Sequence, residues 1–171
     1  LRPMSTPISR RGVLMLGFAG GACAVVSGSC SAATNAQVAH FKSTGRPAMA
    51  IAPASLMHGQ SDAVVQQVLA WAAPLLLGGP VLVYSTAEPE AVKAVQAQLG
   101  VAEAGALVEH ALAAVARGLV GLGVRQLVVA GGETSGACVQ ALGIAQLQIG
   151  PQIDPGVPWC HASSATGGVH I

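Results

Sequence analysis

The sequence predicts an α/β fold: a parallel β-sheet with helices on both faces, forming three layers in a single domain. Strand-like and helix-like segments alternate along most of the chain, and the strand-like segments are nearly continuous apolar runs. Such runs are typical of strands buried on both faces, whereas strands with one face in water alternate apolar and polar residues. The arrangement is Rossmann-like, and a length of 171 residues suits one domain with its own hydrophobic core.

Five short apolar segments bounded by glycine, proline or small polar residues are predicted as strands. They lie at 22–28, 47–53, 80–87, 125–132 and 144–150. The third, PVLVYSTA, is the clearest, because four β-favouring residues follow a proline. The last segment of the chain, 151–171, is rich in proline and glycine, and we expect it to be irregular.

Five helices are predicted between these strands. They lie at 31–45, 61–79, 88–100, 103–123 and 134–143. Gly45 and Gly100 are natural C-terminal stops for the first and third helices. Ser61 and Asp62 are suited to cap the second, and Pro74 should bend or end it.

Composition excludes some classes of function. The net charge is +1 and aromatic residues make up 3% of the chain, so nothing favours nucleic-acid binding. No apolar run reaches the roughly 18–20 residues of a membrane span, and we expect no membrane partner. Only 9% of residues are charged against 52% hydrophobic, which indicates a surface partly covered by something else, or a part of a larger protein.

The four cysteines and five histidines show no metal-binding spacing. None of the cysteines forms a C-x-x-C pair, and no two histidines are at helical spacing, so we expect no zinc or histidine site. We interpret the cysteines as reduced thiols in a cytoplasmic protein. A competing interpretation is that Arg10 and Arg11 begin a twin-arginine export signal. Otherwise residues 1–23 are a linker or the remnant of a missing N-terminal region.

Small polar residues gather where three predicted strands meet their helices, at 27–35, 84–90 and 131–136. All three should lie at the carboxyl edge of the sheet, where ligands bind in parallel α/β folds. Backbone amides and hydroxyls there can bind phosphate oxygens without a cationic side chain. Helix capping explains 84–90 better than ligand binding does, since one hydroxyl caps a helix and acidic residues suit its first turn, and it explains 27–35 equally well.

The segment GGETSG at 131–136 is harder to explain by capping alone, because a cap does not need Glu133, Thr134 and Ser135 between glycines. It is neither a Walker A loop nor a G-x-G-x-x-G dinucleotide loop. We expect Glu133 either to help hold Mg²⁺ or to cap amides of its own loop, since a lone carboxylate would repel a phosphate.

Three blocks of the sequence resemble the nucleotide-binding C-terminal domain of the four-carbon acid sugar kinases, the 3-oxo-tetronate and threonate kinases. They are VVSGSCSAATNAQVAHF, PVLVYSTAEPEAV and LVVAGGETSGACVQALGI with the LQIGPQIDPGVPW that follows, in the family's order. The resemblance spans about residues 24–159, which we take as the nucleotide-binding domain. Residues 160–171 depart from the family pattern, which continues there into a second glycine-containing loop.

The resemblance implies ATP-dependent phosphorylation of a four-carbon sugar acid at its terminal hydroxyl, with ATP and Mg²⁺ as cofactors. By position it assigns the nucleotide to Ser29 and to a loop of Gly131, Gly132, Glu133 and Thr134. The sugar acid itself would be bound by an N-terminal domain that precedes the matched blocks in the family. The alternatives are a non-catalytic nucleotide-binding fragment and an exported protein of unrelated function.

Overall fold

The computed structural model describes residues 21–85, 96–165 and 167–171. The strands in this part of the chain are β1 (Ala22–Ser27), β2 (Ala48–Ala50), β3 (Val81–Tyr84), β4 (Val124–Ala130), β5 (Gln148–Asp154), β6 (Val157–Ser164) and β7 (Gly167–His170). The helices are α1 (Ala32–Ser43), α2 (Ser61–Ala72), α4 (Val101–Gly121) and α5 (Gly132–Ala141), with short 3₁₀ helices η2 (Pro53–Leu56) and η3 (Leu76–Gly78).

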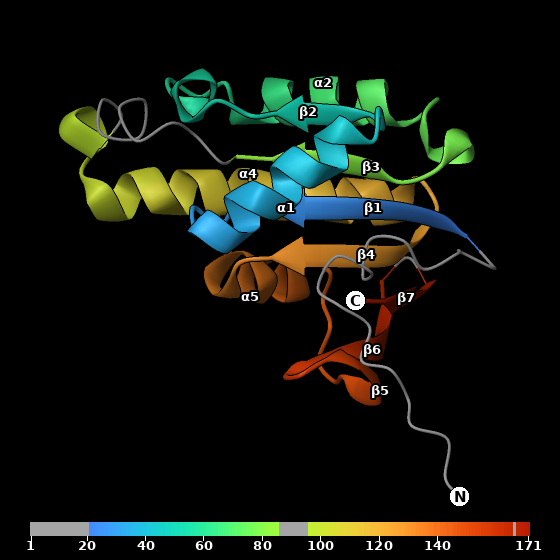
Figure 1. Cartoon of the computed structure of the whole chain (residues 1–171). Helices are drawn as coiled ribbons and strands as arrows, with labels where there is room; N and C mark the ends of the chain where they lie inside the picture. Colours follow the sequence, from blue (N-terminus) through green and yellow to red (C-terminus); the bar gives the residue numbers. More distant parts are fainter. Residues whose placement is uncertain (1–20, 86–95, 166) are drawn as a thin grey trace, which may run out of the picture.

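The described strands form one sheet in the order β2-β3-β1-β4-β7-β6-β5 (Figure 1). From β2 to β7 neighbouring strands are parallel, and Val25 of β1 lies between Leu82 of β3 and Val128 of β4. β6 runs antiparallel to both β5 and β7. The predicted α/β class is therefore confirmed, and the sheet as a whole is mixed, with a parallel part that carries β1, β3 and β4.

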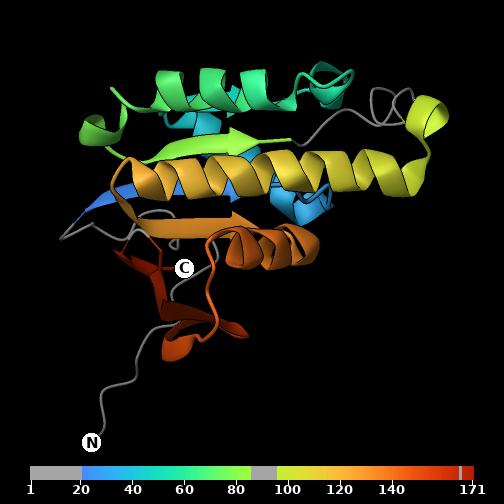
Figure 2. The same ribbon diagram turned by 180° about the vertical axis from the view of Figure 1, so that it is seen from behind.

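Helices cover both faces of the sheet, as predicted. α1 packs on one face, where its Val38 and Phe41 join Val25 and Leu82 in a small core cluster. α2, α4 and α5 pack on the opposite face and bury a larger cluster (Figure 2). Successive residues of β1 point to opposite faces, so Val25 meets α1 while Val26 meets the other helices. This double burial explains why the central strands are apolar throughout.

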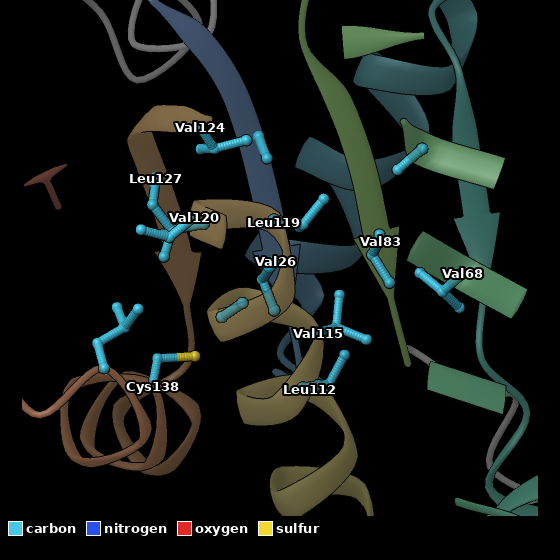
Figure 3. Close-up of a cluster of buried hydrophobic side chains, with 14 of the residues drawn as sticks. Val26, Val68, Val83, Leu112, Val115, Leu119, Val120, Val124, Leu127 and Cys138 are labelled. Atoms are coloured by element: carbon cyan, nitrogen blue, oxygen red, sulfur yellow. The ribbon is translucent and has the colours of Figure 1, made fainter. Parts of the chain in front are cut away.

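The centre of the larger cluster is α4, which lies in front of β1 in the view of Figure 2 and points its side chains at the sheet in Figure 3. Its Leu112, Val115 and Leu119 are fully buried against the sheet and against α2. In the described part of the chain, α4 is the one helix long and apolar enough to cross a membrane by length and composition, with 44% of the tested window buried. The apolar face of α4 is accounted for by its contacts in this core.

The expectation of an irregular segment at 151–171 is wrong. β5 continues to Asp154, turns at Pro155 and Gly156, and pairs with β6, which in turn pairs with β7. Gly156 takes a φ of +79°, a conformation that glycine adopts without strain, and this closes the hairpin. Pairing with β4 draws the last strand into the sheet, so tertiary contacts outweigh the weak strand propensity of its glycines.

Other expectations are met with small shifts. α2 ends at Ala72, two residues before Pro74, as the proline predicts. The strand expected at 144–150 begins only at Gln148 and continues to Asp154, so it lies further along the chain than predicted. The expected helix 88–100 falls mostly outside the described residues, of which 96–99 are helical. Of the linker expected at 1–23, residues 1–20 with Arg10 and Arg11 lie outside the described residues, whereas Ala22 and Cys23 belong to β1.

Candidate functional site

The loops after β1 and β4 lie side by side at the carboxyl edge of the sheet. These strands are parallel neighbours, with Ser27 opposite Ala130. Their pairing extends one residue further, because the Gly28 amide donates to the Ala130 carbonyl oxygen at 3.0 Å. α1 and α5 follow these loops, so the N-termini of both helices begin at the same edge of the sheet.

Two glycines allow the loops to touch. A Cβ added to Gly131 would lie 3.3 Å from the backbone nitrogen of Ser29, and the φ of Gly131 is +120°. A Cβ added to Gly28 would lie 2.9 Å from a methyl carbon of Leu112 and would overlap the side chain of Thr134. Gly28 was not among the predicted site residues. Its position between two serines at a strand end was the available signal.

α5 begins at Gly132, so most of the predicted loop is in fact the first turn of this helix. Gly131 is its N-cap residue, and no side chain caps the helix. The first amides of a helix have no intrahelical partner, and the helix dipole gives them partial positive charge. Gly132 and Glu133 are exposed at this end, whereas Thr134 is buried. The N-terminus of α5 is therefore open to an anionic ligand.

The N-terminus of α1 is organised differently. Its N-cap residue Ser31 accepts a hydrogen bond from the Thr34 amide at 3.1 Å through its side-chain oxygen. The Ser31 amide in turn donates to the Ser29 hydroxyl at 3.3 Å. Ser29 is half-buried and helps to shape the turn that faces Gly131. This turn gives Ser29 a structural role in the free protein, and its hydroxyl still lies at the predicted position.

Two carboxylates from different helices meet beside this edge. Glu133 belongs to the first turn of α5, and Glu109 lies on α4, the helix packed against α5. The pKa of Glu109 is raised above 4.5, mainly by desolvation, then by the negative charge of Glu133 and a side-chain hydrogen bond with it; neighbouring His110 opposes the rise. The two carboxylates thus repel one another unless they share a proton or a cation.

A cavity of about 460 Å³ joins these groups. Among the described residues it is lined by the loops at 28–30 and 131–134, by the face of α4 that carries Glu109, and by Ser85 at the end of β3. Ser85 is 5% exposed, and its hydroxyl oxygen has no hydrogen-bond partner among the described residues. None of these described lining residues is a lysine or arginine.

A second cavity of about 320 Å³ lies on the other side of Gly131, under α1. Its walls are mostly apolar and include Phe41, Val128 and Val157. Its polar groups include Ser27, which is 1% exposed and whose hydroxyl meets no hydrogen-bond partner among the residues described. Gly131 borders both cavities, so the two meet at the loop where α5 begins.

The profile of a protein family described as "nucleotide-binding C-terminal domain" matches residues 24–171, most of the chain. The chain belongs to this family. The matched region of this nucleotide-binding domain includes residues 160–171, the segment that the sequence analysis set apart. It also contains all five predicted site residues.

Several curated relatives of this nucleotide-binding domain are named 3-oxo-tetronate kinase. The Burkholderia multivorans protein is 59% identical over 138 residues, which is 81% of this chain and 31% of the relative. The Cupriavidus necator protein is 58% identical over 134 residues, 78% of this chain and 30% of the relative. The chain therefore spans about a third of the length of the curated relatives that it matches.

Solved structures share the fold of this nucleotide-binding domain. Protein HI1011 of Haemophilus influenzae has a TM-score of 0.76 at 35% identity, covering 88% of this chain and 36% of that one. A Salmonella typhimurium LT2 protein has a TM-score of 0.77 at 35% identity, covering 89% and 37%. A Bordetella bronchiseptica protein, crystallised with citrate, has a TM-score of 0.65 at 19% identity and shows the fold alone.

Proposed function

We propose that this chain is the ATP-binding part of a kinase that phosphorylates a four-carbon sugar acid, 3-oxo-tetronate or threonate, at its terminal hydroxyl. The observation that carries the proposal is the uncapped N-terminus of α5 set against the Ser29 turn. It lies at the sheet edge where such folds bind nucleotides. The names of the relatives supply the substrate class. An ATP-dependent enzyme of this kind belongs in the cytoplasm.

The phosphates are placed at the junction of the two cavities. Amides of Gly132, Glu133 and Thr134 at the start of α5 would donate to phosphate oxygens, as helix N-termini do in other phosphate sites. Gly131 lets the backbone come close because it carries no side chain, and Ser29 offers its hydroxyl from the facing turn. The helix dipole and the amides would thereby stabilise the phosphate charge that a lysine stabilises in a P-loop.

The base of the nucleotide is placed in the 320 Å³ cavity under α1. Flat apolar walls with a few polar groups are what a purine ring requires. Phe41 and Val128 provide such walls, and the hydroxyl of Ser27 lacks a partner that an exocyclic group of the base would supply. Gly131 borders both this cavity and the one at the start of α5, so one nucleotide could place its base in the first and its phosphates beside the second.

The sugar acid is assigned to another part of the kinase. The chain spans about 31% of its relatives, so we place the acceptor site in regions of the relatives outside the matched segment. Phosphoryl transfer requires both substrates in line, and positioning supplies much of the rate. Residues 1–171 alone are therefore expected to bind ATP no better than roughly millimolar, about −4 kcal/mol, and to transfer no phosphate.

The nucleotide site is tested with a matched pair of glycine variants in α5. Gly132 lines the cavity, has no neighbour within 4 Å of an added Cβ and does not require a positive φ. Gly136 is equally open on the same helix but does not line either cavity described above. Gly132→Val should weaken ATP binding more than about tenfold, which is over about 1.4 kcal/mol, whereas Gly136→Val should not. Calorimetry measures both, and equal affinities would rule out phosphate binding at α5.

Catalysis is tested by assaying ADP release with threonate, erythronate and their 3-oxo forms. The 171-residue chain should show no turnover above its acid-independent background. Acid-dependent turnover would contradict the placement of the acceptor site outside this segment. ATP binding without turnover is also expected of the alternative, a non-catalytic nucleotide-binding fragment. The same assay on a full-length relative, with its own matching segment replaced by this domain, separates the two. Only a catalytic domain restores the kinase activity of that chimera.

A further inference from the structure

The cavity at the start of α5 carries negative charge, although the ligand proposed for it is itself an anion. Glu109 and Glu133 contribute two carboxylates, and the described residues that line the cavity include no lysine or arginine. A nucleoside triphosphate would add up to four negative charges. Helix N-termini offset only about half a charge each, so the repulsion is not compensated by the described side chains.

Ser85 is an independent indication of a ligand in this cavity. The residue is only 5% exposed, yet within the described part of the chain its hydroxyl has no hydrogen-bond partner. Burying an unpaired hydroxyl is costly, and most buried polar atoms in native proteins have partners. Ser85 lines the same cavity as the two glutamates. A hydrated or oxygen-bearing ligand there would satisfy it.

We propose that Glu109 and Glu133 together bind the divalent cation that accompanies the nucleotide, with Ser85 hydrogen-bonded to the water shell of this cation. The proposal rests on the proposed function, since it specifies how the same site accepts a nucleotide. Mg²⁺ and Mn²⁺ prefer oxygen ligands, bind through one or two carboxylates and keep several waters, which are completed by phosphate oxygens. The donor set of two carboxylates and one hydroxyl fits this requirement.

The geometry favours a shared cation over a role for either glutamate alone. Glu109 comes from α4 and Glu133 from α5, so only the packing of the two helices brings both side chains to the wall of one cavity. His110 is the other titratable group that acts on Glu109, and it follows Glu109 on α4 as an exposed side chain. In the described part of the chain, no group of three or more histidine, cysteine or acidic side chains is arranged for a metal. A site with two carboxylates therefore leaves the other positions around the cation to water and, when nucleotide is bound, to its phosphate oxygens.

The test is a titration of the full 171-residue chain with Mn²⁺, followed by electron paramagnetic resonance, with and without ADP. Glu109→Gln and Glu133→Gln should each weaken Mn²⁺ binding by at least about tenfold, the lower range seen when groups around a metal are removed. Ser85→Ala should give a smaller loss. Glu103→Gln is the matched control, because Glu103 lies exposed in the first turn of α4 and outside this cavity.

A thermal readout in EDTA shows that the variants are folded. Glu109→Gln should unfold at a higher temperature than wild type without metal, since it removes the repulsion with Glu133, and it should lose the stabilisation by Mn²⁺. A purely structural glutamate pair would give the reverse order. Equal Mn²⁺ affinity in wild type, Glu109→Gln and Glu133→Gln overturns the cation site.

Failure of this proposal is distinguishable from failure of the proposed function. ADP binding measured in EDTA depends on the amides of α5 without help from a cation, and the unscreened glutamates weaken it in the wild type. If ADP binds and Mn²⁺ neither binds nor strengthens ADP binding, the cation site is wrong and the nucleotide site remains. If Mn²⁺ binds through both glutamates and ADP does not bind, the cation site remains and the nucleotide function is wrong.

Discussion

Replacing Gly131 by alanine is expected to lower the free energy of unfolding more than the same replacement at an ordinary glycine turn. The φ of Gly131 is +120°, and an added Cβ would lie 3.0 Å from the Thr134 hydroxyl oxygen and 3.3 Å from the Ser29 nitrogen. Strain in such a backbone conformation costs about 1–3 kcal/mol, and relieving the contacts adds to it. We expect a total loss of about 3 kcal/mol, near the upper end of that range.

Gly143→Ala is the control, because Gly143 also has a positive φ, +66°, but nothing lies within 4 Å of an added Cβ. A left-handed conformation alone costs about 1 kcal/mol. The difference of about 2 kcal/mol corresponds to roughly 4–8 °C in the midpoint of thermal unfolding for a domain of this size. Differential scanning calorimetry without nucleotide measures it. Equal midpoints for the two variants would refute the reasoning that Gly131 holds the two loops in contact.

Three further predictions concern thiols, core packing and pH. Burial raises the pKa of Cys23 to about 12 and that of Cys138 to about 11, so at pH 8 only about one thiol in 10⁴ or 10³ is the reactive thiolate. Iodoacetamide should label exposed Cys30 far faster than either, and peptide mass spectrometry would contradict this if Cys23 or Cys138 were labelled at a comparable rate. Leu119→Ala, at a fully buried position of α4, should lower the free energy of unfolding by about 2–5 kcal/mol, which urea titration measures; a loss well below this would show that the core around α4 is loose. The raised pKa of Glu109 means that the folded state holds this proton more tightly than the unfolded state, so the associated stability is present below pH 4.5 and is lost as the pH rises through the raised pKa. Glu109→Gln should therefore gain stability relative to wild type between pH 4.5 and 7 in EDTA, and an unchanged difference would be evidence against the pairing.

The parallel part of the fold was predictable because its strands are buried on both faces. The apolar runs of β1, β3 and β4 carry this information locally, as does Pro74 for the end of α2. β6 and β7 could not be predicted in the same way. Their sequence contains serine and adjacent glycines with little strand preference, and β7 joins the parallel part of the sheet by pairing with β4, which is distant in the sequence.

Only those parts of the candidate site that directly follow a strand in the sequence were predictable. Ser29 and residues 131–134 could be placed at one edge because both follow predicted parallel strands. Glu109 could not, since it lies inside a long helix with no glycine or cap signal beside it, and only the packing of α4 on α5 brings it to Glu133. Ser85 resembled a helix cap in the sequence, and the structure shows its hydroxyl without a partner. The close approach of the two loops depends on Gly131 and Gly28, whereas a Cβ added to Gly132 meets no atom within 4 Å.

β5 is the last strand of the described sheet, so one side of its backbone faces away from the other strands. Ile149 of this strand is 75% exposed, which makes the edge attractive to a strand from another molecule. Pro151 lies at the middle of β5 and carries no amide hydrogen. A foreign strand could therefore form no uninterrupted ladder of hydrogen bonds along β5. Proline in an edge strand works against pairing with a further strand, so Pro151 opposes self-association at the edge that exposes Ile149.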